Sequence, residues 1–172
     1  HRVTLNGATY GRANVEFLLA HGFVPEESRE AYGQITNEIC KLADQELPKF
    51  PTQRIHGDCH LGNLLWNAHG PFFLDFDDMV MGPCVQDLWL VLPFRGAENQ
   101  EKRDALLEGY AQMHEWNPAS LRIVEILRAL RLIHFSAWIA RRWEDPAFPG
   151  AFPEFGSAKY WAGQIIDLRE QL

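Results

Sequence analysis

The sequence has few cysteines and lacks any long hydrophobic run that is free of charge. Its three cysteines, Cys40, Cys59 and Cys84, are widely spaced and form no C-x-x-C pair. They indicate neither a disulfide framework nor a zinc knuckle. No basic-then-apolar signal segment opens the chain, and several arginines interrupt its most apolar stretch, 121–143. Because such charges are too costly for a lipid-spanning helix, the sequence predicts a cytoplasmic protein with no membrane partner.

An excess of positive charge is also missing. Sixteen Lys and Arg against 23 Asp and Glu give a formal net charge of −7. A surface that binds a nucleic-acid backbone by charge needs the opposite sign, which argues against nucleic acid as a partner. Of the 172 residues, 47% are hydrophobic, enough to bury a core. The length predicts one compact unit or a piece of a longer protein, and a chain that opens on His1 favours the piece.

Proline and glycine divide the chain into segments that are mainly helical. Apolar residues at helical spacing, with caps from Asn117-Pro118 and Ser157, predict these helices. Their expected ranges are 14–20, 26–47, 85–92, 102–116, 117–143 and 157–172, with an irregular aromatic loop at 145–155. The tryptophans, Trp66 and Trp89 among them, are expected in the core because bulky aromatic side chains bury large areas.

The exception to helicity is the segment 54–77. Two short apolar runs, 64–66 and 72–74, flank the turn-rich stretch 67–71, and this arrangement is typical of a β-hairpin. The sequence therefore predicts an α+β fold, mainly α, with one short hairpin.

Polar side chains cluster at the two ends of this hairpin. Asp58 and Asn63 precede its first strand, and Asp75 follows its second, so all three can reach the same rim. Mg²⁺ prefers hard oxygen ligands, usually one or two carboxylates together with substrate phosphates, which suits Asp75 and the amide oxygen of Asn63. Asp58 can then accept the proton of an attacking hydroxyl. The pattern predicts a magnesium–phosphate site with Asp58 as general base.

The motif H-G-D-x-x-x-x-N at 56–63, followed by a hydrophobic residue and D-x-D at 75–77, resembles the aminoglycoside phosphotransferase and choline kinase superfamily. That superfamily is related to the protein kinases. The stretches 82–89, 141–143 and 145–149 resemble bacterial Ser/Thr protein kinases of this fold. The resemblance implies that residues 1–172 are the helical C-terminal lobe of a kinase-like phosphotransferase that uses ATP and Mg²⁺.

The resemblance also implies a role for each residue of the motifs. Asp58 would be the catalytic base, and Asn63 and Asp75 would be the Mg²⁺ ligands. Asp87 would be a buried helix carboxylate that steadies the catalytic loop. Asp77 stands where the D-F-G segment of protein kinases has its glycine, and it either adds a metal contact or is solvated.

The neighbours of the base are expected to be structural. His56 would hold the loop by hydrogen bonds, and His60 would be a loop surface residue. Cys59 has no basic neighbour in sequence that would depress its pKa, so we expect a small buried loop residue rather than a redox site.

The family binds ATP with a small β-rich lobe that supplies a Gly-rich loop, a strand lysine and a helix glutamate. None of the four lysines, Lys41, Lys49, Lys102 and Lys159, lies on a candidate strand. The partner of this chain is therefore expected to be its own N-terminal lobe, and the chain alone is expected to be inactive. The acceptor, a protein Ser/Thr or a small alcohol such as an aminoglycoside, choline or homoserine, stays open.

Three alternatives from other classes also stay open. His56-x-Asp58-x-His60 has a spacing that zinc can use, so a metallohydrolase is one of them. The strand-like run 72–77 ends in D-x-D, which an aspartyl phosphatase would place on a doubly wound sheet. A binding module or pseudokinase-like scaffold is the non-enzymatic alternative.

Overall fold

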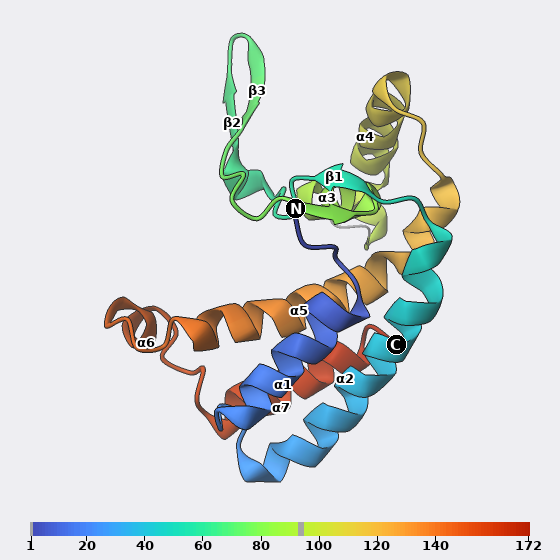
Figure 1. Cartoon of the computed structure of the whole chain (residues 1–172). Helices are drawn as coiled ribbons and strands as arrows, with labels where there is room; N and C mark the ends of the chain where they lie inside the picture. Colours follow the sequence, from blue (N-terminus) through green and yellow to red (C-terminus); the bar gives the residue numbers. More distant parts are fainter. Residues whose placement is uncertain (1, 93–94) are drawn as a thin grey trace. The chain divides into compact units, whose positions relative to one another are not determined.

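The computed structural model describes residues 2–92 and 95–172, and the chain divides into two compact units. One unit comprises residues 1–5 and 48–124, and the other comprises residues 6–47 and 125–172. Most elements are helical (Figure 1). In the described ranges the sheets are two small antiparallel pairs. The α+β, mainly α, fold predicted from the sequence is confirmed.

Four short strands lie in the 48–124 unit. β1 (Gln53–Ile55) pairs with β4 (Val80–Gly82), and β2 (Leu64–Asn67) pairs with β3 (Gly70–Phe73). Both pairs are antiparallel, and neither belongs to a doubly wound sheet. The aspartyl-phosphatase alternative therefore lacks the scaffold that it required.

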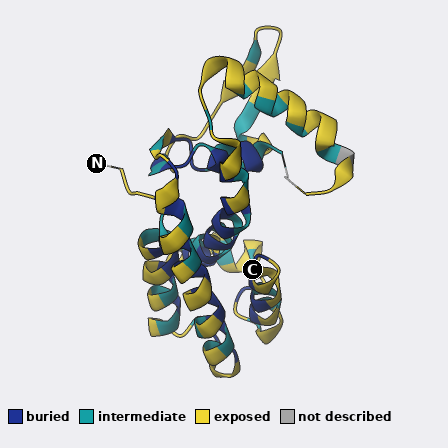
Figure 2. Ribbon diagram, turned by 90° about the vertical axis from the view of Figure 1, so that its right-hand side faces the viewer, coloured by how far each residue is buried: buried dark blue, intermediate teal, exposed yellow. Residues whose placement is uncertain are grey.

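The β2–β3 hairpin confirms the hairpin predicted from the sequence, with a tighter turn. Asn67 pairs with Gly70, so only two residues form the turn. Leu74 lies just beyond the strand. Trp66 is 78% exposed on β2, so its expected place in the core was wrong. Figure 2 shows the exposed residues along this hairpin.

Helical segments complete the 48–124 unit. α3 buries Val85, Leu88 and Trp89, which are spaced so that they share one face. α4 has no buried residue. The segments are η2 (Leu47–Lys49), at the unit boundary, η3 (Leu61–Asn63), α3 (Val85–Val91), η4 (Ala97–Asn99), α4 (Gln100–Met113) and η5 (Pro118–Ile123).

The other unit is built from helices alone among its described residues. Its core includes Leu18, Tyr32, Leu130 and Trp161, each fully buried, with Tyr32 and Trp161 edge to face at 5.2 Å between ring centroids. The elements are η1 (Gly7–Arg12), α1 (Ala13–Ala20), α2 (Glu26–Glu46), α5 (Val124–Arg141), which begins at the unit boundary, α6 (Ala147–Ala151) and α7 (Ala158–Arg169).

Both predicted helix caps are confirmed. The Ser157 side chain accepts a hydrogen bond from the Tyr160 N–H at 3.1 Å, and the Asn117 side chain accepts one from the Ala119 N–H at 2.9 Å. The helix predicted at 117–143 is a 3₁₀ segment, η5, followed by α5.

Several elements were not predicted, among them the β1–β4 pair and the short segments η2, η3 and η4. η1 is a π-helix, and the short α6 lies inside the expected irregular loop. At Gly11, in η1, an added Cβ would lie 2.3 Å from the Cys40 Sγ, so a glycine is needed for this close packing on α2. No described helix is both long enough and apolar enough to cross a membrane.

Candidate active site

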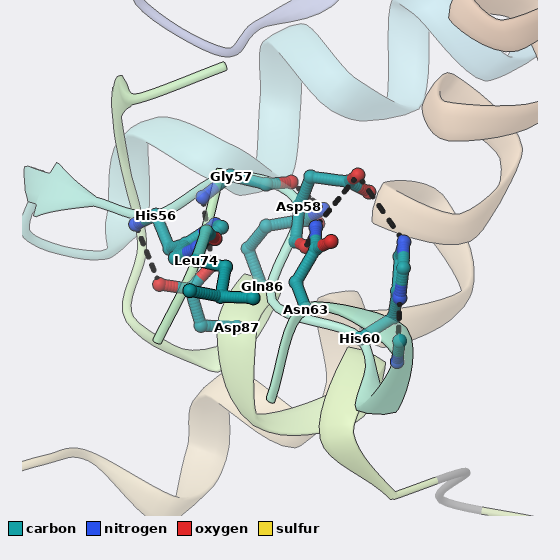
Figure 3. A network of polar contacts seen from close by, with 9 residues as sticks. His56, Gly57, Asp58, His60, Asn63, Leu74, Gln86 and Asp87 are labelled. Carbon is teal, nitrogen blue, oxygen red and sulfur yellow. Dashed lines mark hydrogen bonds and ion pairs between the residues drawn. The ribbon is translucent and has the colours of Figure 1, made fainter. Parts of the chain in front are cut away.

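Side chains of α3 hold the loop that follows β1. The Asp87 carboxylate accepts hydrogen bonds from the backbone N–H of His56 at 2.8 Å and of Gly57 at 2.9 Å. The Gln86 side chain donates to the Gly57 carbonyl at 3.4 Å. These contacts fix the backbone immediately before Asp58 (Figure 3).

Gly57 allows this loop to pass close to the segment after β3. Its φ is +86°, in the left-handed region that favours glycine. An added Cβ would lie 2.4 Å from the Asp78 carbonyl oxygen. The glycine of the H-G-D motif is therefore required both by its backbone angle and by the space around it.

His56 joins the two halves of the motif. It is 7% exposed, and its Nε2 lies 2.7 Å from the Leu74 carbonyl oxygen, so Nε2 carries the proton that it donates. The imidazole ring also packs at 4.9 Å from the Phe76 ring. Through these contacts His56 links the Asp58 loop to the segment that carries Asp75.

Asp58 and Asn63 are in direct contact. The Asn63 amide nitrogen donates to the Asp58 carbonyl at 2.9 Å and to its carboxylate at 3.4 Å. The His60 Nε2 lies 3.4 Å from the same carboxylate oxygen. Because its amide nitrogen faces Asp58, Asn63 keeps its amide oxygen for another partner.

Leu74, the residue before Asp75, lies opposite Asn63 at the end of the hairpin. The Leu74 N–H donates to the Asn63 carbonyl at 2.9 Å, which extends the β2–β3 pairing by one residue. Asp75 then adopts a φ of +57°, which is uncommon for a residue other than glycine and is seen more often for aspartate. The side chain of Asp75 is exposed, as is that of Asp77; among the described residues, no hydrogen bond or ion pair holds either carboxylate.

Burial raises the pKa of the Asp87 carboxyl above its usual value, and the two N–H donors only partly offset this effect. Burial, together with the nearby Asp87 and Asp58 carboxylates, raises the pKa of the Cys59 thiol to about 12. Cys59 is 4% exposed. At neutral pH it is a protonated, buried loop residue, as the sequence predicted.

The oxygen donors fit a hard divalent cation better than they fit zinc. Asn63 and Asp75 offer an amide and a carboxylate oxygen from the base of one hairpin, the chemistry that Mg²⁺ prefers. His60 Nδ1 accepts from the Gly62 N–H at 3.0 Å, and His56 uses Nε2 for Leu74. In the part of the chain that the structure describes, no three His, Cys, Asp or Glu side chains are placed to hold a metal. This geometry disfavours the metallohydrolase alternative.

The comparison with known families shows to which family the chain belongs. The family model described as the phosphotransferase enzyme family matches residues 11–124. The chain belongs to this family. The superfamily resemblance predicted from the sequence is confirmed.

Relatives in this family include bacterial kinases. Over 149 residues the chain is 44% identical to stress response kinase A of Salmonella paratyphi A and 40% identical to that of Escherichia coli K12. It is also 44% identical to the serine/threonine protein kinase RdoA of Salmonella typhimurium. Each match covers 86% of this chain and 45% of the relative, so the chain spans about half the length of these curated relatives.

A solved structure has the same fold. The amicoumacin kinase hAmiN, in a complex with AMP-PNP, Ca²⁺ and Ami, matches 99% of this chain and 50% of its own length, with a TM-score of 0.64 and 19% identity. At this identity the match establishes the fold of this chain and says nothing of its substrate.

Sequence reasoning missed two groups at the site. Gln86 is 2% exposed and bridges the Gly57 carbonyl and the Trp89 indole N–H; a glutamine beside Asp87 in an apolar helix was the available signal. The second is the backbone carbonyl of Leu74, the acceptor of His56, which no side-chain pattern encodes.

Proposed function

We propose that this chain is the C-terminal lobe of a cytoplasmic, ATP- and Mg²⁺-dependent phosphotransferase that transfers the γ-phosphoryl group to a hydroxyl. The observation that carries this proposal is the polar network around Asp58. Asp87 holds the loop backbone just before Asp58, the His56 ring ties this loop to the Leu74 carbonyl, and Asn63 contacts Asp58 directly. Phosphoryl transfer relies mainly on such positioning and on charge neutralisation.

In this proposal Asp58 is the catalytic base. Its side chain is 19% exposed and its Oδ1 is buried, so Oδ2 is the carboxylate oxygen left for a substrate to reach. The two donors on its Oδ2, from Asn63 and His60, fix its orientation. A carboxylate held in this way can accept the proton of the attacking hydroxyl and aim its oxygen at the phosphorus.

Asn63 and Asp75 are the proposed Mg²⁺ ligands, and Asp77 is a further candidate. Bound Mg²⁺ would neutralise charge on the transferring phosphate. The Leu74 backbone, fixed by Asn63 and His56, sets where Asp75 lies. The left-handed backbone of Asp75 is an unusual conformation of the kind that gathers at functional sites.

The proposed acceptor is a Ser or Thr hydroxyl of a protein. It is supported by the names of the relatives, stress response kinase A and serine/threonine protein kinase RdoA. The second candidate is a small-molecule alcohol, favoured by the shared fold with a kinase named for amicoumacin.

The proposed partner of the chain is an N-terminal ATP-binding lobe. The relatives are more than twice as long as the matched segment, which leaves room for such a lobe. The hairpin carries an apolar surface, formed by Leu65, Trp66, Phe72 and Phe73, that is 47–78% exposed. Exposed apolar patches of this kind usually contact a partner, and we assign this one to the adjoining lobe. By itself the chain should bind nucleotide weakly and turn over little.

The test is a phosphotransfer assay with γ-labelled ATP and Mg²⁺ on the full-length protein and on this chain alone. Protein substrates and small alcohols serve as acceptors. We expect label transfer to protein by the full-length protein and none by the chain alone. Transfer only to a small alcohol would select the second candidate. Micromolar affinity of the isolated chain for Mg·ATP would contradict the need for a second lobe. It would also argue against the non-enzymatic scaffold alternative.

A further inference from the structure

His60 lies two residues after the proposed base, and its side chain serves two partners at once. It is the N-cap of η3, where its Nδ1 accepts the Gly62 N–H at 3.0 Å. Its Nε2 lies 3.4 Å from the Asp58 Oδ2 (Figure 3). The side chain is 42% exposed, so solvent reaches the ring although both of its nitrogens face the loop.

The backbone fixes the point from which this ring extends. The His60 N–H donates to the Asp58 carbonyl at 2.9 Å, and the His60 carbonyl accepts the Asn63 N–H at 2.9 Å. His60 is therefore held between the proposed base and a proposed metal ligand. The rotation of its side chain is what remains to be set, and the hydrogen bond from the Gly62 N–H sets it.

The contact with Gly62 also decides which ring nitrogen carries the proton. A backbone N–H only donates, so the His60 Nδ1 presents its lone pair to Gly62. The ring is then neutral with its proton on Nε2, the nitrogen that faces the Asp58 carboxylate. Because Nδ1 cannot take up a proton without breaking its bond to Gly62, the geometry fits a fixed donor and disfavours a proton relay through the ring.

Gly62 makes room for the imidazole. A Cβ added to Gly62 would lie 2.8 Å from the His60 Cε1 and 2.9 Å from its Nδ1, too close for either atom to stay in place. Gly62 is not among the described glycines with a positive φ, so its backbone angles do not require a glycine. The ring that lies against it does.

The Asp58 Oδ2 is the atom through which this ring can act on the reaction. Oδ1 is buried, so a substrate hydroxyl meets Oδ2, and the Asn63 amide nitrogen lies 3.4 Å from the same oxygen. Both contacts are long for hydrogen bonds to a carboxylate, and contacts of this kind often shorten when substrate binds. Phosphoryl transfer depends mainly on how the reacting groups are positioned, so a donor that closes onto Oδ2 would orient the oxygen that takes the proton.

We propose that His60 is a positioning residue for phosphoryl transfer. Its Nε2–H, fixed by Gly62 through the other ring nitrogen, orients the Asp58 Oδ2 for the acceptor hydroxyl. This proposal rests on the proposed function, and it gives His60 a role in turnover that is separate from its role as a helix cap. The two roles use different ring nitrogens, so substitution can separate them.

Two amide side chains make this separation. Asparagine places its oxygen close to the position of Nδ1 and is a favoured N-cap, but it is too short to reach Asp58. Glutamine can place its amide nitrogen close to the position of Nε2, and it is not among the favoured caps.

Kinetics of the full-length protein use the acceptor that the wild type labels from γ-labelled ATP. His60→Asn should lower kcat about 10-fold, the value of one hydrogen bond to a charged group, with the KM values for ATP and acceptor within about 2-fold of the wild type. His60→Gln should keep kcat within about 3-fold of the wild type. The Tm of this chain should follow the opposite order, with His60→Asn above His60→Gln. A residue that acts only as a cap would give the same order in kcat and Tm.

The matched control is His69→Asn, the same substitution at an exposed position of the hairpin turn, which should leave kcat and both KM values unchanged. Equal losses of kcat in His60→Asn and His60→Gln would overturn the positioning role. A raised KM at unchanged kcat in His60→Asn would also overturn it, because the lost interaction would then serve substrate binding alone.

A measurement on this chain tests the geometry without turnover. ¹⁵N NMR of the imidazole ring in mildly alkaline buffer should show the neutral His60 tautomer with its proton on Nε2. A proton on Nδ1 would overturn the proposal even if the full-length protein is active. A full-length wild type that transfers no label to any acceptor would instead refute the proposed function, and the role of His60 with it.

Discussion

Replacing Asp87 by alanine should destabilise the loop that carries Asp58. The carboxylate is the acceptor for two neighbouring backbone N–H groups, those of His56 and Gly57, at 2.8 and 2.9 Å. Both residues are buried, so water cannot easily replace the lost acceptor. Leaving a buried donor unsatisfied costs about 1–3 kcal/mol. Two donors, with some relief from no longer burying a charge, predict a loss of about 2–5 kcal/mol in the free energy of unfolding.

Residue-resolved hydrogen exchange is the appropriate assay because the chain has two units and need not unfold in one step. In Asp87→Ala we expect the amides of His56 and Gly57 to lose protection, while amides of the helical 6–47 and 125–172 unit keep theirs. Asp77→Ala is the matched control: it removes an exposed carboxylate, and its effect should stay within about 0.5 kcal/mol. Equal protection of His56 and Gly57 in the two variants would refute the reasoning.

The stability that Asp87 contributes should depend on pH, because the pKa of its carboxyl is raised in the folded protein. A carboxyl whose pKa is higher in the folded state contributes stability that is fully present below the unfolded value of about 4 and is lost as pH rises through the folded pKa. Asp87→Asn removes this titration. Relative to Asp87→Asn, the wild type should therefore gain stability as pH falls through that window, which urea denaturation at a series of pH values can measure.

Three further predictions concern the same loop. Gly57→Ala should destabilise the protein by about 1–3 kcal/mol, because the φ of Gly57 is positive and an added Cβ would clash with the Asp78 carbonyl oxygen. The control, Gly109→Ala, lies in α4 with open space around it and should stabilise the protein by about 0.5–1 kcal/mol. Thermal unfolding measures both changes. Cys59, with a pKa of about 12, should react with iodoacetamide at pH 8 more slowly than the half-buried Cys84, and equal rates by mass spectrometry would contradict its assignment as a protonated thiol. Asp58→Asn should lower phosphotransfer by the full-length protein at least about 100-fold without lowering Tm, whereas Asp77→Asn should retain more activity; a similar loss in both would argue against Asp58 as the base.

Local patterns in the sequence predicted much of the fold. The caps at Asn117 and Ser157 and the hairpin are short-range features, and each is present in the structure. The π-helix η1 was not predicted, and in it Gly11 lies close to Cys40, a contact between residues far apart in sequence that local patterns do not reveal. The exposure of Trp66 could not be predicted either, because the hydrophobicity of a side chain does not tell whether the fold buries it.

The spacing of the motifs predicted that Asp58, Asn63 and Asp87 lie together, but not how they are held, and among the described residues no hydrogen bond joins the Asp75 carboxylate to the other three. Asp58 and Asn63 do lie in contact, and Asp87 does reach the loop. The link between His56 and the second half of the motif runs through the backbone carbonyl of Leu74. Backbone groups are present at every position, so nothing in the residue pattern distinguishes the one that is used.

This link has a consequence for the way such sequences can diverge. Position 74 contributes its N–H and its carbonyl, while its side chain is 41% exposed. Many residue types should therefore be interchangeable there in a library of functional variants. Proline is the exception: it has no N–H to donate and would detach Asn63 from the strand that leads to Asp75.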